Sequence, residues 1–594
     1  MVIGALLSLC VSSLGGPTEA PPNLVVIYVD DLSSAWELPS VMTPNMHALA
    51  QRGVRFSRAY AGHALCSPSR ASLLAGQRTI HTQHFGNVDD LPPSPVNGVP
   101  YLPCMLRESG YHTSGVGKIF HEEHPEYFDE FHNFADDPWI EKPLLDHADP
   151  DLDAKVYGGP FLNSPTGELG KMADTKRTDK ARMLIVEGKQ RILETGQPFA
   201  VFLGFEATHG PLVYPEMYCD DYTELDVPPL PPEETAVDWK SEVNDASFQT
   251  PWFYDPAWGA TAAEQRVQAM LAYFRCVSFV DEQVGRLLTC LANVGLASST
   301  IVVLVSDHGT SFDEHAHLGK TTGFDEDIVA PLIIAVPGIP GTHGQQVSTP
   351  VAQVDLYPTL MELLGLSAPV GLDGTSLVNL LQHPNMPHPP VFYTTDEEWG
   401  FNLTRWVVKR DAASGTVWKL GAWERDNDIP QVNQLYELVG DPGEYDNRYT
   451  DVDAAAKVDE LAHELLDVWL LGPATRSFGA GAAGLMGVPA LTWSGVPTLG
   501  AHGTLSLGNR SGTPTLGLLT IGFSGIPPGP KSNGVKQQLT MLVAIPVEGL
   551  ELPLTLPSSA ACDELPVGLQ LEEVDPAATG GIARSRALGL FLSD

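Results

Sequence analysis

Short, continuous apolar runs recur along the chain from residue 23 to about residue 390. They span residues 24–29, 199–205, 301–305 and 332–336. These runs are rich in β-branched and aromatic residues and show no polar alternation, which is typical of strands that are buried on both faces. The pattern therefore predicts several buried, parallel strands.

Stretches with helical periodicity separate these runs, near residues 176–195 and 260–294. A further helix is expected after Thr43-Pro44, with the Thr43 hydroxyl as its cap, Pro44 in its first turn and Gly53 at its end. Strands that alternate with helices predict an α/β sandwich around a mostly parallel sheet. We expect this catalytic domain to span residues 21–390.

The pattern changes twice toward the C-terminus. Short strand-like pieces at 406–409 and 416–420, followed by a helical run over 454–471, predict a small α+β subdomain over residues 391–474. Beyond 475 the chain is rich in Gly, Pro, Leu, Thr and Ser, and the apolar runs 515–523, 539–545 and 550–556 predict an all-β accessory module over 475–594, a small β-sandwich. A disordered tail is the alternative, but the apolar content argues against it.

The N-terminus has the features of a targeting segment. Residues 2–15 are apolar but too short to span a bilayer well, and Thr18-Glu19-Ala20 offers a cleavage point. We predict a signal peptide over residues 1–20, although no basic residue precedes Arg52. The expected location is secreted or periplasmic, without stable membrane insertion.

Charge and cysteine content narrow the function. The chain has 73 acidic and 34 basic residues and a formal net charge of -39, which argues against nucleic acid or an anionic membrane surface as a partner. An anionic substrate would need a local cationic pocket. Seven cysteines in 594 residues do not make a disulfide scaffold, and Cys276 and Cys290 are expected to be buried apolar residues.

Polar side chains follow two of the predicted strands directly. Asp30 and Asp31 follow the first run, and Asp307 and His308 follow the third. In parallel sheets, ligands bind beyond the carboxyl ends of the strands, so these side chains can converge on one site. An Asp-Asp pair alone is better explained as a helix cap or a solvated loop; together with Asp307-His308 it indicates a cation site.

The segment Cys66-Ser67-Pro68-Ser69-Arg70, continued through Leu74-Ala75-Gly76, resembles the signature of the sulfatase family. The resemblance covers most of residues 23–450. Gly117 to His121, His308 and the Lys320 region with Phe324-Asp325 are most similar to the iduronate-2-sulfatase branch. It implies an alkaline-phosphatase-like fold and the hydrolysis of sulfate monoesters, on a sulfated carbohydrate or another sulfate ester.

The resemblance also implies a cofactor and a modified residue. A cation, usually calcium, would be held by five side chains: Asp30, Asp31, Cys66, Asp307 and His308. A His ligand is unusual for so hard a cation, which leaves Mg²⁺ and Mn²⁺ as alternatives. Cys66 would be oxidised to formylglycine by a formylglycine-generating enzyme. When the aldehyde is hydrated, one hydroxyl attacks sulfur and the other later lets sulfate leave.

Further roles follow from the matched motifs. Arg70 and Lys118 would hold the formylglycine oxygens, and His121 would accept the proton that triggers sulfate release. His209 and Lys320 would bind the sulfate oxygens and favour the leaving alkoxide, with His209 as the proton donor.

Three departures leave the sugar open. Thr310 and Thr321 stand where aromatic residues are common in the branch, and His47 replaces a frequent acidic residue. One alternative is a phosphonate or phosphodiester hydrolase of the same superfamily. Another is a non-catalytic glycan-binding protein, which predicts a lost ligand or nucleophile, and none is missing.

Overall fold

A computed structural model describes most of the chain before residue 471 and a set of strands after it. The described residues are 21–87, 91–133, 164–166, 172–210, 212–229, 261–312, 314–316, 318–339, 342–395, 404–423 and 434–470, with the strands between 490 and 591. The signal peptide predicted for residues 1–20 lies outside them. The three predicted domain boundaries stay predictions.

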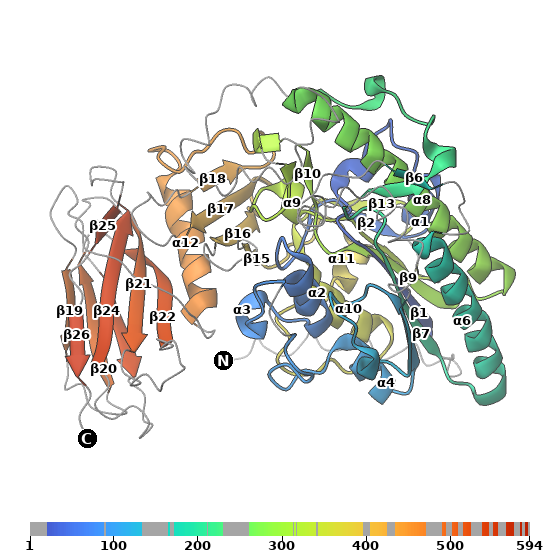
Figure 1. Cartoon of the computed structure of the whole chain (residues 1–594). Coiled ribbons are helices and arrows are strands. Elements are labelled where there is room, and N and C mark those ends of the chain that lie inside the picture. The colour runs from blue at the N-terminus through green and yellow to red at the C-terminus, as the bar shows by residue number, and fades with distance from the viewer. Residues whose placement is uncertain are drawn as a thin grey trace, which may run out of the picture.

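An eight-stranded sheet forms the centre of the molecule, in the order β13-β2-β12-β9-β1-β7-β4-β5 (Figure 1). Its strands are β1 (Asn23–Val29), β2 (Val54–Phe56), β4 (His112–Gly117), β5 (Glu130–His132), β7 (Phe199–Phe205), β9 (Thr300–Ser306), β12 (Leu332–Ala335) and β13 (Gln345–Val347). β1 pairs in parallel with β7 and β9, whereas β12 runs antiparallel to β9 and β2. The predicted mostly parallel sheet is therefore confirmed.

Helices cover both faces of this sheet (Figure 1). One face packs against α1 (Pro44–Arg52), α6 (Ala173–Thr195) and α8 (Ala262–Asn293), and the other against α2 (Cys66–Ala75), α4 (Leu102–Glu108) and α10 (Leu356–Leu363). Alternate residues of β1 point to opposite faces, so Ile27 joins the first core and Val26 the second. This two-sided burial explains why the strands are continuously apolar.

The start of α1 corrects one prediction. Pro44 lies in the first turn and Gly53 follows the last residue, as expected. Thr43 precedes the helix, but its side chain makes no capping hydrogen bond. Its hydroxyl donates instead to the Trp36 carbonyl at 2.9 Å. The predicted Thr43 cap is wrong because the preceding turn engages the hydroxyl.

The predicted α+β subdomain is present. It contains the antiparallel sheet β15-β16-β17-β18 and helix α12. The bounds are β15 (Val391–Thr395), β16 (Thr404–Arg410), β17 (Val417–Trp423), β18 (Gln434–Glu437) and α12 (Ala455–Leu470). Leu461 and Leu465 of α12 pack against Val407 and Leu420 of the sheet. This packing gives the subdomain its own small core.

The residues that the structure describes after 470 all lie in strands, as predicted. The strands are β19 (Ala490–Ser494), β20 (His502–Gly508), β21 (Thr515–Phe523), β22 (Gln537–Ile545), β23 (Leu550–Thr555), β24 (Pro566–Val574), β25 (Ile582–Arg584) and β26 (Leu588–Phe591). They form the sheets β19-β20-β23 and β22-β21-β24-β25, with β26 paired to β24. β22 lies beside α12 of the subdomain (Figure 1).

Helix α8 contains two of the cysteines. Cys276 and Cys290 are buried within α8, as predicted. Among the described residues, no helix has the length and apolar content that a membrane span requires.

Candidate active site

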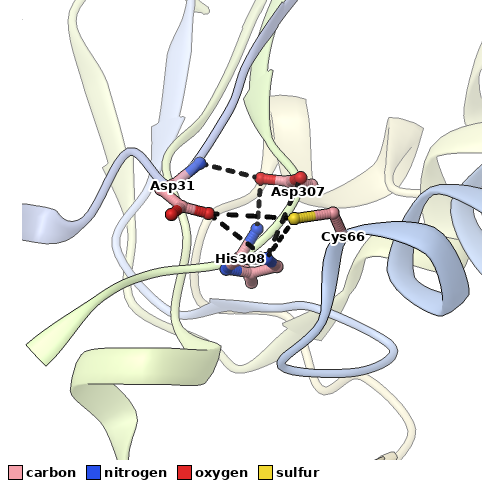
Figure 2. Close-up of side chains that lie close together, drawn as sticks. All are labelled: Asp31, Cys66, Asp307 and His308. Atoms are coloured by element: carbon pink, nitrogen blue, oxygen red, sulfur yellow. Dashed lines mark hydrogen bonds and ion pairs between the residues drawn. The ribbon is translucent and has the colours of Figure 1, made fainter. Parts of the chain in front are cut away.

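The carboxyl ends of β1 and β9 bring the predicted acidic residues together. Val29 is paired with Ser306, so the residues that follow these strands leave the sheet side by side. The Asp31 amide donates to Asp307 Oδ1 at 3.0 Å. Asp31 has a φ of 55°, a left-handed conformation that Asp tolerates better than most residues. Figure 2 shows Asp31, Asp307 and His308 facing Cys66.

Cys66 is the first residue of α2, and the whole helix is buried. Its Sγ lies 3.3 Å from His308 Nε2 and 4.0 Å from Asp31 Oδ1 (Figure 2). The following residue, Ser67, is held by two side chains: Asn87 Oδ1 accepts its amide at 3.0 Å, and its hydroxyl lies 2.6 Å from His84 Nε2. The first turn of the helix, and with it Cys66, is therefore fixed in place.

Arg70 lies one turn after Cys66 and is fully buried. Its guanidinium donates to Asp307 Oδ2 at 2.8 Å and to Asp30 Oδ1 at 3.0 Å. It also donates to the Lys118 carbonyl at 2.5 Å. Arg70 thus binds the two strand ends and the segment after β4 at once.

Lys118 and His121 follow the carboxyl end of β4. Lys118 Nζ lies 2.6 Å from Asp30 Oδ2. The backbone of Lys118 passes very close to β7, because a Cβ on Gly204 would lie 1.9 Å from the Lys118 carbonyl oxygen. Glycine at 204 therefore permits this approach. His121 is partly buried, and its charge interactions include Lys118 and Cys66.

His209 and Lys320 complete the set. His209 lies in the loop after β7, and one of its ring nitrogens is close enough to Cys66 and Asp30 for the three side chains to bind the same metal ion. Lys320 Nζ lies 2.8 Å from Asp31 Oδ1 and 3.1 Å from Cys66 Sγ. The structure thus brings all the site residues predicted from the sequence into one place.

The site concentrates charge of both signs in a buried volume. Burial alone would raise the pKa of Asp30, but Lys118 and Arg70 hold it well below its usual range. Burial would likewise raise the pKa of the Cys66 thiol, and Lys320 and Lys118 hold it well below its usual value. A negative charge at position 66 is therefore stabilised.

The two metal-ligand candidates after β9, Asp307 and His308, both have raised pKa values, which favours their protonated forms. Burial raises the pKa of Asp307 to about 6, although Arg70 opposes the shift. Burial would lower the pKa of His308, but Asp307 raises it to about 9. Because metal ligands must be deprotonated, a cation would compete with protons here.

The donor set fits a divalent cation. One ligand atom from each of Asp31, Cys66, Asp307 and His308 lies within 4.8 Å of the others, as does one from each of Asp30, Cys66 and His209. Asp30, Asp31 and Asp307 supply carboxylate oxygens, which suit a hard cation. Asp30 belongs to the second group because its carboxylate is turned toward Arg70 and Lys118.

Several supporting residues carried no sequence signal. Tyr273 of α8 donates to the Asp31 carbonyl at 2.8 Å and accepts from the Ser33 amide at 2.7 Å, which fixes the turn after β1. His84 holds Ser67, and Asp327 lies fully buried behind Lys320. These contacts depend on the tertiary fold, so no local sequence pattern predicts them.

Two of the departures noted in the sequence, Thr310 and His47, have defined contacts. Thr310 is buried, and its hydroxyl donates to the Gly319 carbonyl at 2.9 Å. His47 packs its ring against Trp36 at 5.1 Å, with Nδ1 2.8 Å from the Thr43 carbonyl. Both side chains contact their own neighbouring loops.

Family models match two long segments of the chain. The Sulfatase model matches residues 22–366, which is more than half of the 594 residues. A second model, N-sulphoglucosamine sulphohydrolase, C-terminal, matches residues 313–469. The second match includes the α+β subdomain.

Individual proteins agree with these matches. A sulfatase from Formosa agariphila is 29% identical over 463 residues, covering 74% of this chain and 85% of that protein. Human iduronate 2-sulfatase is 27% identical over 506 residues, covering 73% of this chain and 84% of that protein. Among solved structures, a phosphonate monoester hydrolase from Silicibacter pomeroyi has a TM-score of 0.60 at 24% identity, covers 76% of this chain and 96% of its own, and shares the fold. The chain belongs to the sulfatase family and is a sulfuric ester hydrolase.

Proposed function

We propose that the chain hydrolyses sulfate monoesters of a sulfated sugar or polysaccharide through a formylglycine made from Cys66. The observation that carries this proposal is the position of Cys66 Sγ, 3.3 Å from His308 Nε2 and 3.1 Å from Lys320 Nζ. The side chain at 66 is therefore surrounded by the predicted cation ligands and by a lysine that can bind sulfate.

The chemistry favours an aldehyde over a thiol at this position. A hydrated aldehyde carries two hydroxyls on one carbon. One hydroxyl gives up its proton to a base as its oxygen attacks sulfur, the bond from sulfur to the substrate oxygen breaks, and the alcohol leaves with a proton supplied by an acid. A base then removes the proton of the second hydroxyl, the carbon–oxygen bond to the sulfate group breaks, and the aldehyde reforms. Water restores the hydrate, so attack of water on the hindered sulfur is avoided.

The surrounding residues supply charge and protons. Arg70 and Lys118 hold the carboxylates beside residue 66 and offset negative charge there. His121 accepts the proton of the second hydroxyl, and His209 donates a proton to the leaving alcohol. Lys320 binds a sulfate oxygen and stabilises negative charge that develops on the leaving group.

A cation completes the site. Asp30, Asp31, Asp307, His308 and the modified residue 66 would hold it, and the oxygen-rich donor set is best suited to calcium. When bound, it supplies Lewis-acid stabilisation of negative charge. Mg²⁺ and Mn²⁺ are the alternatives to test.

The substrate class rests on the relatives. The family likeness to iduronate 2-sulfatase, together with the Gly117 to His121 and Lys320 segments, supports a sulfated carbohydrate. Maturation requires a formylglycine-generating enzyme as a partner. The apolar N-terminal segment supports a secreted or periplasmic location.

A second candidate is hydrolysis of phosphonate or phosphate esters. It is favoured by the fold shared with a phosphonate monoester hydrolase. A third, a glycan-binding protein without catalysis, is disfavoured because every predicted ligand and the nucleophile precursor lie together.

The test begins with peptide mass spectrometry across residues 58–78, on protein produced together with a formylglycine-generating enzyme. The same sample is then assayed with an aryl sulfate and an aryl phosphonate, with Cys66→Ala as the control. We expect the aldehyde at 66, release of sulfate, and loss of activity in Cys66→Ala. Faster cleavage of the phosphonate would favour the second candidate, and full activity in Cys66→Ala would refute the mechanism.

A further inference from the structure

The backbone on both sides of Lys320 adopts unusual conformations. Gly319 has a φ of 126° and Thr321 a φ of 91°. Glycine tolerates such a value, but for a β-branched residue it is a genuine outlier with a conformational cost. Such a conformation persists only when surrounding contacts impose it, so the loop around Lys320 must be held from outside.

Asp327 provides that hold from the short helix α9 (Asp325–Ile328). Its side chain is fully buried. Oδ2 accepts from the Thr322 amide at 2.9 Å and from the Thr322 hydroxyl at 2.7 Å, which fixes the backbone just after the strained Thr321. A buried carboxylate that accepts several hydrogen bonds is a strong local anchor.

The same carboxylate also fixes the segment before Lys320. Oδ1 accepts from the Ser311 hydroxyl, and Ser311 is paired with Gly319 in the two-stranded sheet β10 (Ser311–Phe312) and β11 (Leu318–Gly319). Asp327 therefore reaches both sides of Lys320, through Ser311 on one side and Thr322 on the other.

The backbone of Asp327 reaches the other side of the site. Its carbonyl accepts from the Gly309 amide at 2.8 Å, directly after Asp307 and His308. One residue thus links the loop that carries Lys320 to the loop that carries two proposed metal ligands. The link sets where Lys320 Nζ lies relative to Asp31 and Cys66.

We propose that Asp327 is a positioning residue for catalysis, which holds the strained Lys320 backbone so that Lys320 Nζ reaches the sulfate site beside residue 66. The inference rests on the role proposed above for Lys320. Asp327 acts through Thr322 and the Lys320 loop.

The first test compares substitutions of Asp327 with a matched control. Asp327→Ala removes both arms of the hold, whereas Asp327→Asn retains an oxygen for the Thr322 amide and offers an amide group to the Ser311 hydroxyl, which can also accept. Asp281→Ala is the control, because Asp281 is a buried carboxylate that accepts from the Asn45 and Met46 amides, away from the site.

The expected readout is specific to positioning. With a series of aryl sulfates, Asp327→Ala should lower kcat by up to about 100-fold with little change in KM, since a displacement of about 1 Å can cost this much. The loss should grow as the leaving alcohol becomes less acidic, because Lys320 then stabilises more charge. Asp327→Asn should retain most of the rate, and Asp281→Ala should leave the leaving-group dependence unchanged.

Two combinations make the test decisive. Thr321→Gly removes the conformational cost, so adding it to Asp327→Ala should restore part of the lost kcat. In a Lys320→Ala background, Asp327→Ala should lower kcat little further, as expected when two residues act as one unit. Hydrogen exchange at residues 319–322 should become faster in Asp327→Ala, a readout that does not depend on activity.

The outcomes separate this inference from the proposed function. The positioning role alone would be overturned by a low kcat in Lys320→Ala together with a wild-type kcat in Asp327→Ala. It would also be overturned if the losses of kcat in the two single variants added fully in the double variant. Wild-type activity in Lys320→Ala would refute the role proposed for Lys320 itself, and the positioning role with it.

Discussion

At the scale of single residues, His121 and His209 carry opposite pKa shifts that match opposite roles. Burial, reinforced by Lys118, lowers the pKa of His121, which keeps it neutral and able to accept a proton. Burial would lower the pKa of His209, but the Asp31 carboxylate outweighs this and raises it, which keeps the ring protonated.

These shifts predict a bell-shaped dependence of kcat on pH, because kcat includes both the release of the alcohol and the later release of sulfate. Activity should rise as His121 loses its proton, below the ordinary histidine pKa of about 6.5, and fall as His209 loses its proton above that value. His209→Gln should remove the alkaline limb and slow alkyl sulfates more than aryl sulfates. Steady-state rates between about pH 4 and pH 10 check this; an unchanged alkaline limb in His209→Gln would exclude His209 as the proton donor.

The acidic residues at the strand ends predict that a cation stabilises the fold. A ligand that binds only the folded state, at 100 times its dissociation constant, adds about 2.7 kcal/mol. We therefore expect calcium to raise the Tm of EDTA-treated protein, and Asp31→Asn to abolish most of that rise. Asp355→Asn is the control, because Asp355 is also buried but accepts from Ala352 and Thr375. An equal calcium effect in both variants would place the cation elsewhere.

At the scale of elements, the close approach of β7 to the segment after β4 predicts a sensitive glycine. In Gly204→Ala the new Cβ would lie 1.9 Å from the Lys118 carbonyl oxygen, so the backbone must shift and carry Lys118 away from Asp30. We expect kcat to fall strongly, by about 100-fold for a displacement of 1 Å. Gly440→Ala should have little effect, since its Cβ would meet the flexible end of Glu437. Comparable kcat values for the two variants would contradict this account.

Four central strands, β1, β7, β9 and β12, are predictable because each is a continuous apolar run. β1, followed by Asp30, and β9, followed by Asp307, are recognisable in this way. The Thr43 cap was wrongly predicted, because the competing Trp36 carbonyl is brought close only by the fold. The hydrogen bonds of Asp327 to Thr322 and Ser311 are not predictable from the sequence either, since they depend on how α9, β10 and the Lys320 loop pack together.

At the scale of the whole molecule, a buried ion cluster joins the α+β subdomain to the catalytic domain. Lys419 of β17 lies fully buried, with Nζ 2.7 Å from Asp325 of α9 and 2.6 Å from Glu444. The ammonium also lies 5.1 Å from the Trp406 ring centroid. Because α9 follows the Lys320 loop, the contact of Lys419 with Asp325 connects the subdomain to the segment that carries Lys320.

Lys419→Met should therefore destabilise the protein far more than a surface substitution. Removing one partner of a buried pair costs about 3–5 kcal/mol, because the remaining Asp325 carboxylate loses its counter-charge. Lys409→Met is the matched control: Lys409 pairs with Glu460 and Glu464 of α12 in a partly exposed position, where a pair contributes about 0–1 kcal/mol. Chemical denaturation of both variants at pH 7 measures the difference.

The pH dependence of that loss gives a further check on its cause. Burial raises the pKa of Glu444 to about 8, although Lys419 opposes the shift, and without Lys419 the folded state favours the protonated carboxyl further. When folding raises the pKa of a carboxyl, the folded protein loses stability as pH rises from the unfolded pKa of that carboxyl, about 4.3, toward its folded pKa. The destabilisation by Lys419→Met should thus be larger at pH 9 than at pH 6. A loss independent of pH would assign the effect of Lys419 to packing against Trp406, with its charge contributing little.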